Sequence, residues 1–181
     1  WSDHPARGAD VDVNPLARDG RPVVLNATDA QRAEIIRRYR LYSYQPDEMI
    51  TLRALSGIKP SEGRFDPRLY QYGGLWVYPV GALLRVAALT GCVALKSDVA
   101  WYLNHPEAFG RFYVVARLYA AAWGLIGLWA VYWIARRLTG GARLPSLFAG
   151  LAYACMPVVI NMAHEAKPHL PGAALQLLAI L

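Results

Sequence analysis

The sequence predicts an all-α, polytopic helical membrane protein, and three observations carry this prediction. Hydrophobic residues make up 55% and charged residues 18% of the 181-residue chain, whereas soluble domains average about 45–50% and about 25%. Residues 75–181 contain several long apolar runs and only three acids. A short loop with three arginines and no acid joins two of these runs, which is typical of a cytoplasmic connection between membrane spans.

The net charge of +6 is unevenly distributed. Residues 1–74 contribute +1, and residues 75–181 contribute +5. This composition excludes a disordered chain, a nucleic-acid-binding domain that acts through bulk charge, and a small disulfide scaffold. Cys92 and Cys155 lie inside apolar runs, so we expect both to be small core residues.

Residues 1–74 are predicted to form an extracytoplasmic loop with juxtamembrane helices. Thr28 and Gln31 resemble a capping box that opens a basic helix over 29–42. This helix is expected either to be solvated on its charged face or to lie among lipid headgroups. A second helix over 47–55 has Asp47 and Glu48 in its first turn, where the helix dipole favours acids. A loop rich in glycine and proline follows over 56–74.

The apolar half predicts three transmembrane helices, over 112–135, 144–163 and a truncated 171–181. The first has one charge, Arg117, and the second has none; each is long enough for a bilayer core of about 30 Å. Residues 75–95 are predicted to be juxtamembrane or re-entrant instead, because Pro79, Arg85 and two glycines interrupt them. Since the sequence starts without methionine and stops inside an apolar run, we expect it to be part of a larger protein.

The basic loop over 136–143 sets the orientation. If this loop is cytoplasmic, the segments before residue 112 and after residue 163 face the opposite side. Asp47 and Glu165 then share the outer face, provided that residues 75–95 do not cross the membrane. A shared face would let the two acidic segments form one site.

Two acidic segments could carry chemistry. Asp47 and Glu48 could deprotonate an acceptor hydroxyl or hold a divalent cation, or they could simply cap a helix. Glu165 is the only acid in the last 74 residues. With His164 and His169 it could bind a divalent metal, and Lys167 could contact a phosphate. The alternative is a polar connector wetted by headgroups.

The segment over 64–78 mixes arginines, tyrosines and glycines. Arg64 and Tyr72 would suit a sugar or phosphate pocket, through charge-assisted hydrogen bonds and stacking. An ordinary aromatic loop at the membrane interface would have a similar composition.

Four motifs follow one another in an order that resembles a known family. They are Pro46-Asp47-Glu48, the run Tyr-Gly-Gly-Leu-Trp-Val-Tyr-Pro over 72–79, Arg-Arg-Leu-Thr-Gly over 136–140 and Ala-Lys-Pro-His over 166–169. Over roughly residues 44–181 the chain resembles the start of the GT-C membrane glycosyltransferases. More narrowly, it is similar to the protein O-mannosyltransferase and lipid A aminoarabinose transferase relatives, which include bacterial enzymes with the RgtA-type domain.

The resemblance implies a multi-pass enzyme of the inner (cytoplasmic) membrane. Such an enzyme moves a sugar from a polyprenyl-phosphate carrier to a lipid, glycan or protein acceptor on the extracytoplasmic face. It implies a catalytic role for Asp47, with Glu48 beside it. The family's second acid usually follows a proline, but His169 stands there and Glu165 is the nearest acid. The family's first span, expected before Asp47, is also absent from this sequence.

Membrane lipids are the other expected partner, and no nucleic acid is expected. A divalent ion at Glu165 and His169 would be the only cofactor. Two other function classes stay open from the sequence: a transporter or flippase of a lipid-linked sugar, and a non-catalytic membrane subunit. We see no internal repeat of the kind common in transporters.

Overall fold

The computed structural model describes residues 29–181, which fall into two units. The described part of the first unit holds one helix, α1 (Asp29–Leu41), in which Glu34 pairs with Arg37 and Arg38. This helix coincides with the predicted basic helix over 29–42. The predicted capping box lies outside the described residues.

The regular secondary structure of the second unit, Ser43–Leu181, is helical. Its helices are α2 (Glu48–Gly57), α3 (Gly74–Leu89), α4 (Val99–Asn104), α5 (Pro106–Leu138), α6 (Arg143–Ala154), α7 (Pro157–Ala163) and α8 (His169–Ile180), with the short 3-10 turns η2 (Pro60–Glu62) and η3 (Tyr70–Tyr72). Over residues 29–181 there is no strand, and one isolated antiparallel bridge joins Lys59 and Arg64. The all-α fold is therefore confirmed for the described residues.

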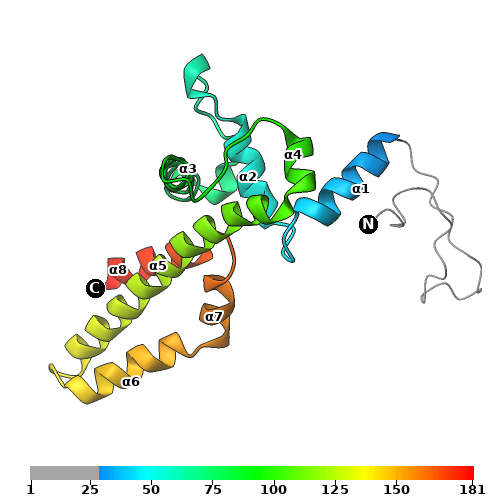
Figure 1. Ribbon diagram of the computed structural model, residues 1–181. Coiled ribbons are helices and arrows are strands. Elements are labelled where there is room, and N and C mark those ends of the chain that lie inside the picture. The colour runs from blue at the N-terminus through cyan, green and yellow to red at the C-terminus, as the bar shows by residue number, and fades with distance from the viewer. Residues whose placement is uncertain (1–28) are drawn as a thin grey trace, which may run out of the picture. The chain divides into compact units, whose positions relative to one another are not determined.

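Helix α5 organises this unit. It runs for 33 residues, and α3, α6, α7 and α8 all pack against it (Figure 1). It begins earlier than the predicted 112–135 segment because Pro106 occupies its first position, where a missing N–H costs nothing. It ends just before Gly140 and Gly141, whose φ angles of 62° and 91° turn the chain back into α6.

The length and composition needed to cross a membrane are found in α5. Within the described residues a second span arises only if α6 and α7 are taken together, across a bend of 58°. The run over 144–163 was expected to be one helix, but Pro157 cannot donate to the carbonyl of Tyr153. Met156 N–H bonds to that carbonyl instead, and the helix breaks there.

Helix α3 occupies the interrupted segment over 75–95. Its 16 residues reach about 24 Å, short of a bilayer core of about 30 Å. Two hydrogen bonds connect α3 to α2 and α5. Trp76 Nε1 donates to Thr51 Oγ1 on α2 at 3.0 Å, and the Tyr119 hydroxyl of α5 donates to the Leu75 carbonyl at 2.9 Å. The outer face of α3 is apolar and exposed, with Leu75, Leu83, Val86 and Leu89.

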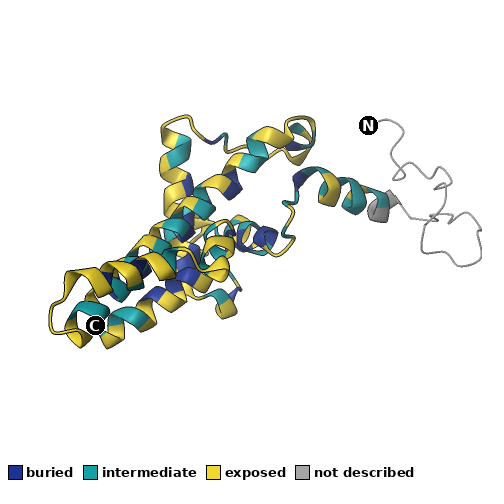
Figure 2. Cartoon of the chain, turned by 90° about the horizontal axis from the view of Figure 1, so that it is seen from below, coloured by how far each residue is buried: buried dark blue, intermediate teal, exposed yellow. Residues whose placement is uncertain are grey.

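Both cysteines are exposed, so the prediction that they are core residues is wrong. Cys92 lies in the turn after α3, and Cys155 lies at the break between α6 and α7, so each cysteine stands where a helix ends. Buried residues follow the faces where helices meet, and exposed ones cover the outer faces (Figure 2). Four exposed apolar residues lie along α6: Leu144, Leu147, Phe148 and Leu151.

Small residues let the helices approach α5 closely. A Cβ built on Gly124 would lie 3.3 Å from Leu170 of α8, and one built on Gly127 would overlap the Tyr153 hydroxyl of α6. That hydroxyl is buried and has no hydrogen-bond partner among the residues that the structure describes. Close approach through small residues is a common way for helices to associate in membranes.

Gly127→Ala is predicted to destabilise the protein, because the Tyr153 ring must move to admit the new methyl group. The expected cost is about 1–3 kcal/mol, as for overpacking elsewhere. Tyr153→Phe removes the contacting oxygen, so the double variant should recover part of the loss. The midpoint of thermal unfolding in detergent measures both effects.

Gly110→Ala is the matched control on the same helix, because a Cβ there has no neighbour within 4 Å. It should leave the midpoint unchanged or raise it, since alanine is the better helix former. Equal midpoints for Gly127→Ala and the control would contradict the close approach of α5 and α6.

Candidate functional site

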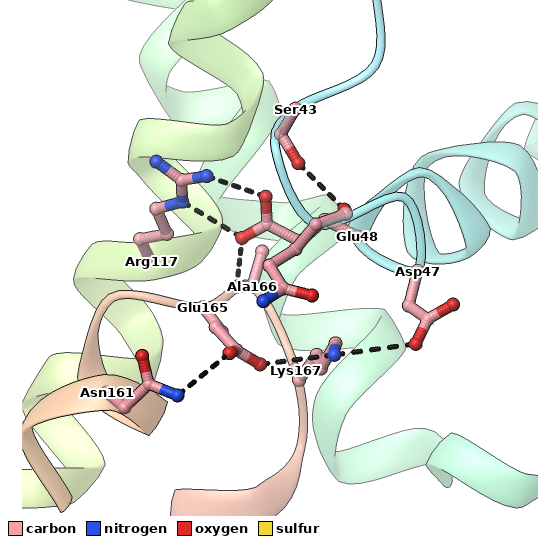
Figure 3. A network of polar contacts seen from close by, with 9 residues as sticks. Ser43, Asp47, Glu48, Arg117, Asn161, Glu165, Ala166 and Lys167 are labelled. Carbon is pink, nitrogen blue, oxygen red and sulfur yellow. Dashed lines mark hydrogen bonds and ion pairs between the residues drawn. The ribbon is translucent and has the colours of Figure 1, made fainter. Parts of the chain in front are cut away.

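Five charged side chains from three segments of the second unit meet in one place (Figure 3). We call them the charged cluster: Asp47 and Glu48 at the start of α2, Arg117 within α5, and Glu165 and Lys167 in the connection between α7 and α8. The two acidic segments that the sequence singled out therefore lie together.

Glu48 is at the centre of the charged cluster and is completely buried. Arg117 grips it with two parallel hydrogen bonds, Nε to Oε1 at 2.9 Å and Nη2 to Oε2 at 2.6 Å. The backbone N–H of Ala166 donates to Oε1 at 2.6 Å. A bidentate arginine–carboxylate pair is among the strongest polar contacts in proteins, so Glu48 joins α2, α5 and the α7–α8 connection.

The surroundings of Glu48 keep it ionised. Burial alone would raise the pKa of this carboxyl. The hydrogen bonds from Arg117, Ser43 and the Ala166 backbone, together with the positive charge of Arg117, outweigh burial and hold the pKa of Glu48 below its ordinary value. The hydrogen-bond donors that stabilise the ionised Glu48 carboxylate therefore come from the protein itself.

Lys167 lies between two carboxylates. Its Nζ is 3.1 Å from Glu165 Oε2 and 3.4 Å from Asp47 Oδ2. Burial would lower the pKa of Lys167, but the contacts with Glu165 and then Asp47 raise it above its usual range. The ammonium group is therefore held charged at neutral pH.

Asp47 and Glu165 differ in their access to solvent. The Asp47 side chain is 62% exposed and makes no capping hydrogen bond to α2. The Glu165 side chain is 6% exposed, and its Oε1 accepts from Asn161 Nδ2 at 3.4 Å. Within the described part of the chain, Glu165 Oε2 forms the ion pair with Lys167 and has no hydrogen-bond partner. Asp47 is thus the carboxylate that an incoming molecule can reach.

The structure separates the two residues predicted to bind substrate in the aromatic segment. Tyr72, at the end of η3, lies near the charged cluster: burial and then the charge of Asp47 raise the pKa of its hydroxyl, against an opposing effect of Lys167. Arg64 instead pairs with Glu62 at 2.6 Å in the loop after α2, and within residues 29–181 it has no contact with the charged cluster.

The predicted metal pair does not form a metal centre in the described residues. His169 begins α8 and lines a shallow apolar cavity of about 360 Å³ with Tyr153, Met162 and Leu170. The two oxygens of Glu165 face Asn161 and Lys167, which are donors rather than co-ligands. No group of three or more His, Cys, Asp or Glu side chains in this part of the chain could hold a metal ion, so the described residues add no third side-chain ligand of these types to the predicted pair.

Arg117 is the site residue that sequence reasoning missed. The signal was present, because Arg117 is the only charge in the apolar run over 112–135. An ionisable residue inside a membrane-like helix usually faces a partner or a functional cavity. The hydrogen bonds between Arg117 and Glu48 offset the cost of placing a charge in this apolar helix.

Comparison with known proteins gives one match. Residues 105–181 match the family model described as dolichyl-phosphate-mannose-protein mannosyltransferase. The match covers less than half of the chain, and it includes Arg117, Glu165 and Lys167. It confirms the predicted resemblance to GT-C membrane glycosyltransferases. No curated protein and no solved structure matches the chain.

Glu48→Gln tests the ionised state of the buried carboxylate. Because the folded pKa of Glu48 is lowered, its ionisation stabilises the fold above the unfolded pKa of about 4.3 and stops doing so as the pH falls through the folded value. The wild-type unfolding midpoint should therefore fall more steeply than that of Glu48→Gln below about pH 5. Circular dichroism against temperature at each pH gives both curves.

The Glu48→Gln variant should also be less stable than wild type at neutral pH, since the hydrogen bonds to a charged group are lost. Parallel acid-side slopes for the two proteins would show that Glu48 is not held ionised by Arg117.

Proposed function

We propose that this chain is the part of a GT-C glycosyltransferase that activates an acceptor hydroxyl and binds the phosphate of a polyprenyl-phosphate sugar donor. The observation that carries the proposal is the placement of the exposed Asp47 carboxylate beside the Lys167 ammonium. The match of residues 105–181 to a mannosyltransferase family supports the same reaction class.

In the proposed reaction Asp47 is the general base. Its carboxylate takes the proton of the acceptor hydroxyl while the hydroxyl oxygen bonds to the anomeric carbon of the sugar. The bond between that carbon and the carrier phosphate breaks, and its electron pair stays on the phosphate oxygen. The anomeric configuration is inverted, and the products are the glycosylated acceptor and the free carrier phosphate.

Lys167 stabilises the charge that develops on the leaving phosphate. An ammonium held beside the reacting groups needs no reorganisation during the reaction, which is the basis of electrostatic catalysis. On donor binding, the phosphate becomes a third anionic neighbour of Lys167, after Glu165 and Asp47. Tyr72 lies near the same two groups and would line the sugar side of the site.

Glu48 has a positioning role in this proposal. Sequence reasoning gave it a catalytic role beside Asp47, but its carboxylate is fully buried and bonded to Arg117 and Ala166. A substrate hydroxyl has no access to it. Through its hydrogen bond with Ala166, Glu48 holds the α7–α8 connection against the start of α2. Lys167 belongs to that connection, and Asp47 lies at the start of α2.

The proposed placement is in the inner membrane, with the charged cluster on the extracytoplasmic side. Helix α5 and the bent α6–α7 pair would cross the bilayer, the 12 residues of α8 would form part of a further span, and α3 would stay at the interface. Two features support this arrangement: the acid-free arginine turn between α5 and α6, and a helix α3 too short to span.

Asp47→Asn is predicted to lower the transfer rate by about 10²–10⁴-fold, because the amide cannot accept the proton. The assay is transfer of radiolabelled sugar from a polyprenyl-phosphate donor by the purified full-length protein. Glu107→Gln, an exposed acid in the first turn of α5, should keep full activity. Wild-type turnover by Asp47→Asn would rule out the base.

The same assay in sealed vesicles separates a transferase from a transporter. Label that crosses the membrane while still attached to its carrier, with no glycosylated acceptor formed, would support the transporter or flippase alternative.

Lys167→Ala is predicted to lower kcat/KM for the donor by about 10–100-fold, the usual effect of losing a hydrogen bond to a charged group. Lys167→Arg keeps the charge and should recover most of the loss. Lys59→Ala is the control, because Lys59 pairs with Glu62 outside the charged cluster. If Lys167→Ala left both KM for the donor and kcat unchanged, Lys167 would have no role in binding the donor or in stabilising the leaving phosphate.

A further inference from the structure

The turn between α5 and α6 gathers positive charge without any acid. We call residues 136–143 the arginine turn; it contains Arg136, Arg137 and Arg143. Arg137 and Arg143 are exposed, and neither side chain has an ion-pair or hydrogen-bond partner within residues 29–181. The nearest acids in the sequence are Glu107 and Glu165, at or beyond the far ends of the helices that the turn joins. These charges therefore have no counterion from the described protein.

The backbone of the turn brings the arginines together. Gly141 N–H bonds to the Arg136 carbonyl at 2.7 Å, which closes the turn at the end of α5. Arg143 is the first residue of α6, so it lies directly after this closure. Figure 1 shows the turn between α5 and α6. A Cβ on Gly141 would lie 4.0 Å from Arg136 Nη2, so the Arg136 side chain folds back over the turn.

Apolar and aromatic side chains surround the same turn. The Arg136 guanidinium lies 5.8 Å from the centre of the Trp133 ring, and that ring is 41% exposed. Leu138 and Leu144, on either side of the turn, are 82% and 66% exposed. The exposed apolar residues of α6 continue away from the turn with Leu147 and Leu151.

We propose that the arginine turn is a binding site for an anionic phospholipid. The lipid phosphate would replace the missing counterion of the three arginines, and one acyl chain would lie along the exposed apolar face of α6. Arginine forms bidentate contacts with phosphate, basic pockets between membrane helices bind acidic headgroups, and tryptophan favours the headgroup level. The inference rests on the membrane placement proposed above, but it does not depend on sugar transfer.

Native mass spectrometry of the detergent-solubilised full-length protein tests the site. Phosphatidylglycerol and phosphatidylcholine with the same acyl chains are added at equal concentration, without any sugar donor. Phosphatidylglycerol should remain bound in excess. The triple variant Arg136→Gln, Arg137→Gln, Arg143→Gln should reduce this excess by at least about tenfold, because each arginine near an anionic headgroup contributes to binding.

Two matched variants separate charge from loss of structure. The triple lysine variant at the same positions keeps the charge and should keep most of the preference. Replacing Arg53, Arg68 and Arg85 with glutamine removes the same charge from exposed positions elsewhere, and it should change nothing.

Three results would overturn the proposal. They are equal retention of the two lipids by wild type, an undiminished preference in the triple glutamine variant, and an equal loss in the Arg53, Arg68 and Arg85 variant. Displacement of the lipid by an equal concentration of inorganic phosphate would show a site for free phosphate instead. Because no donor is present, a failed transfer assay and a failed lipid assay are independent outcomes.

Discussion

The bond between Glu48 and Arg117 is the interaction on which the site depends. A buried carboxylate without partners is very unfavourable, and here the guanidinium of α5 and the Ala166 N–H supply them. These contacts join the start of α2 to the connection between α7 and α8, two segments that are far apart in the sequence. Asp47 and Lys167 are the immediate neighbours of the joined residues. Their proximity is therefore a consequence of the Glu48 bond more than of their own weak contact at 3.4 Å.

Much of the architecture could be predicted because it depends on local sequence. The length of the apolar run and its single charge identify the helix that became α5, and the glycines at 140 and 141 follow its end. The interruptions over 75–95 predict a segment that does not span the membrane, and the helix in this segment, α3, has 16 residues. The two acidic segments could be expected on one face because the basic loop sets the direction of the helices between them.

Other features depend on tertiary contacts that local sequence does not encode. Asp47 and Glu48 are adjacent acids, and only the position of Arg117 decides that Glu48 is buried while Asp47 stays exposed. His169 belongs to the Ala-Lys-Pro-His motif that resembles the family, but it lines an apolar cavity. In the described chain it belongs to no group of three or more possible metal ligands. Both cysteines lie in apolar runs of the sequence, yet each stands where a helix ends. Both are therefore exposed although their sequence neighbours are apolar.

The charged cluster contains three carboxylates and two cations. On the proposed reaction, the donor enters as a phosphodiester with one negative charge, whereas the carrier leaves as a phosphomonoester with a second pKa near 6 and almost two charges. In the same proposed reaction Asp47 takes the acceptor's proton, so the carboxylate charge that Asp47 loses offsets the charge that the carrier phosphate gains. The excess of carboxylates would return only when Asp47 releases this proton to solvent, which its 62% exposure allows. Release of the proton would then add a repulsion that favours departure of the spent carrier.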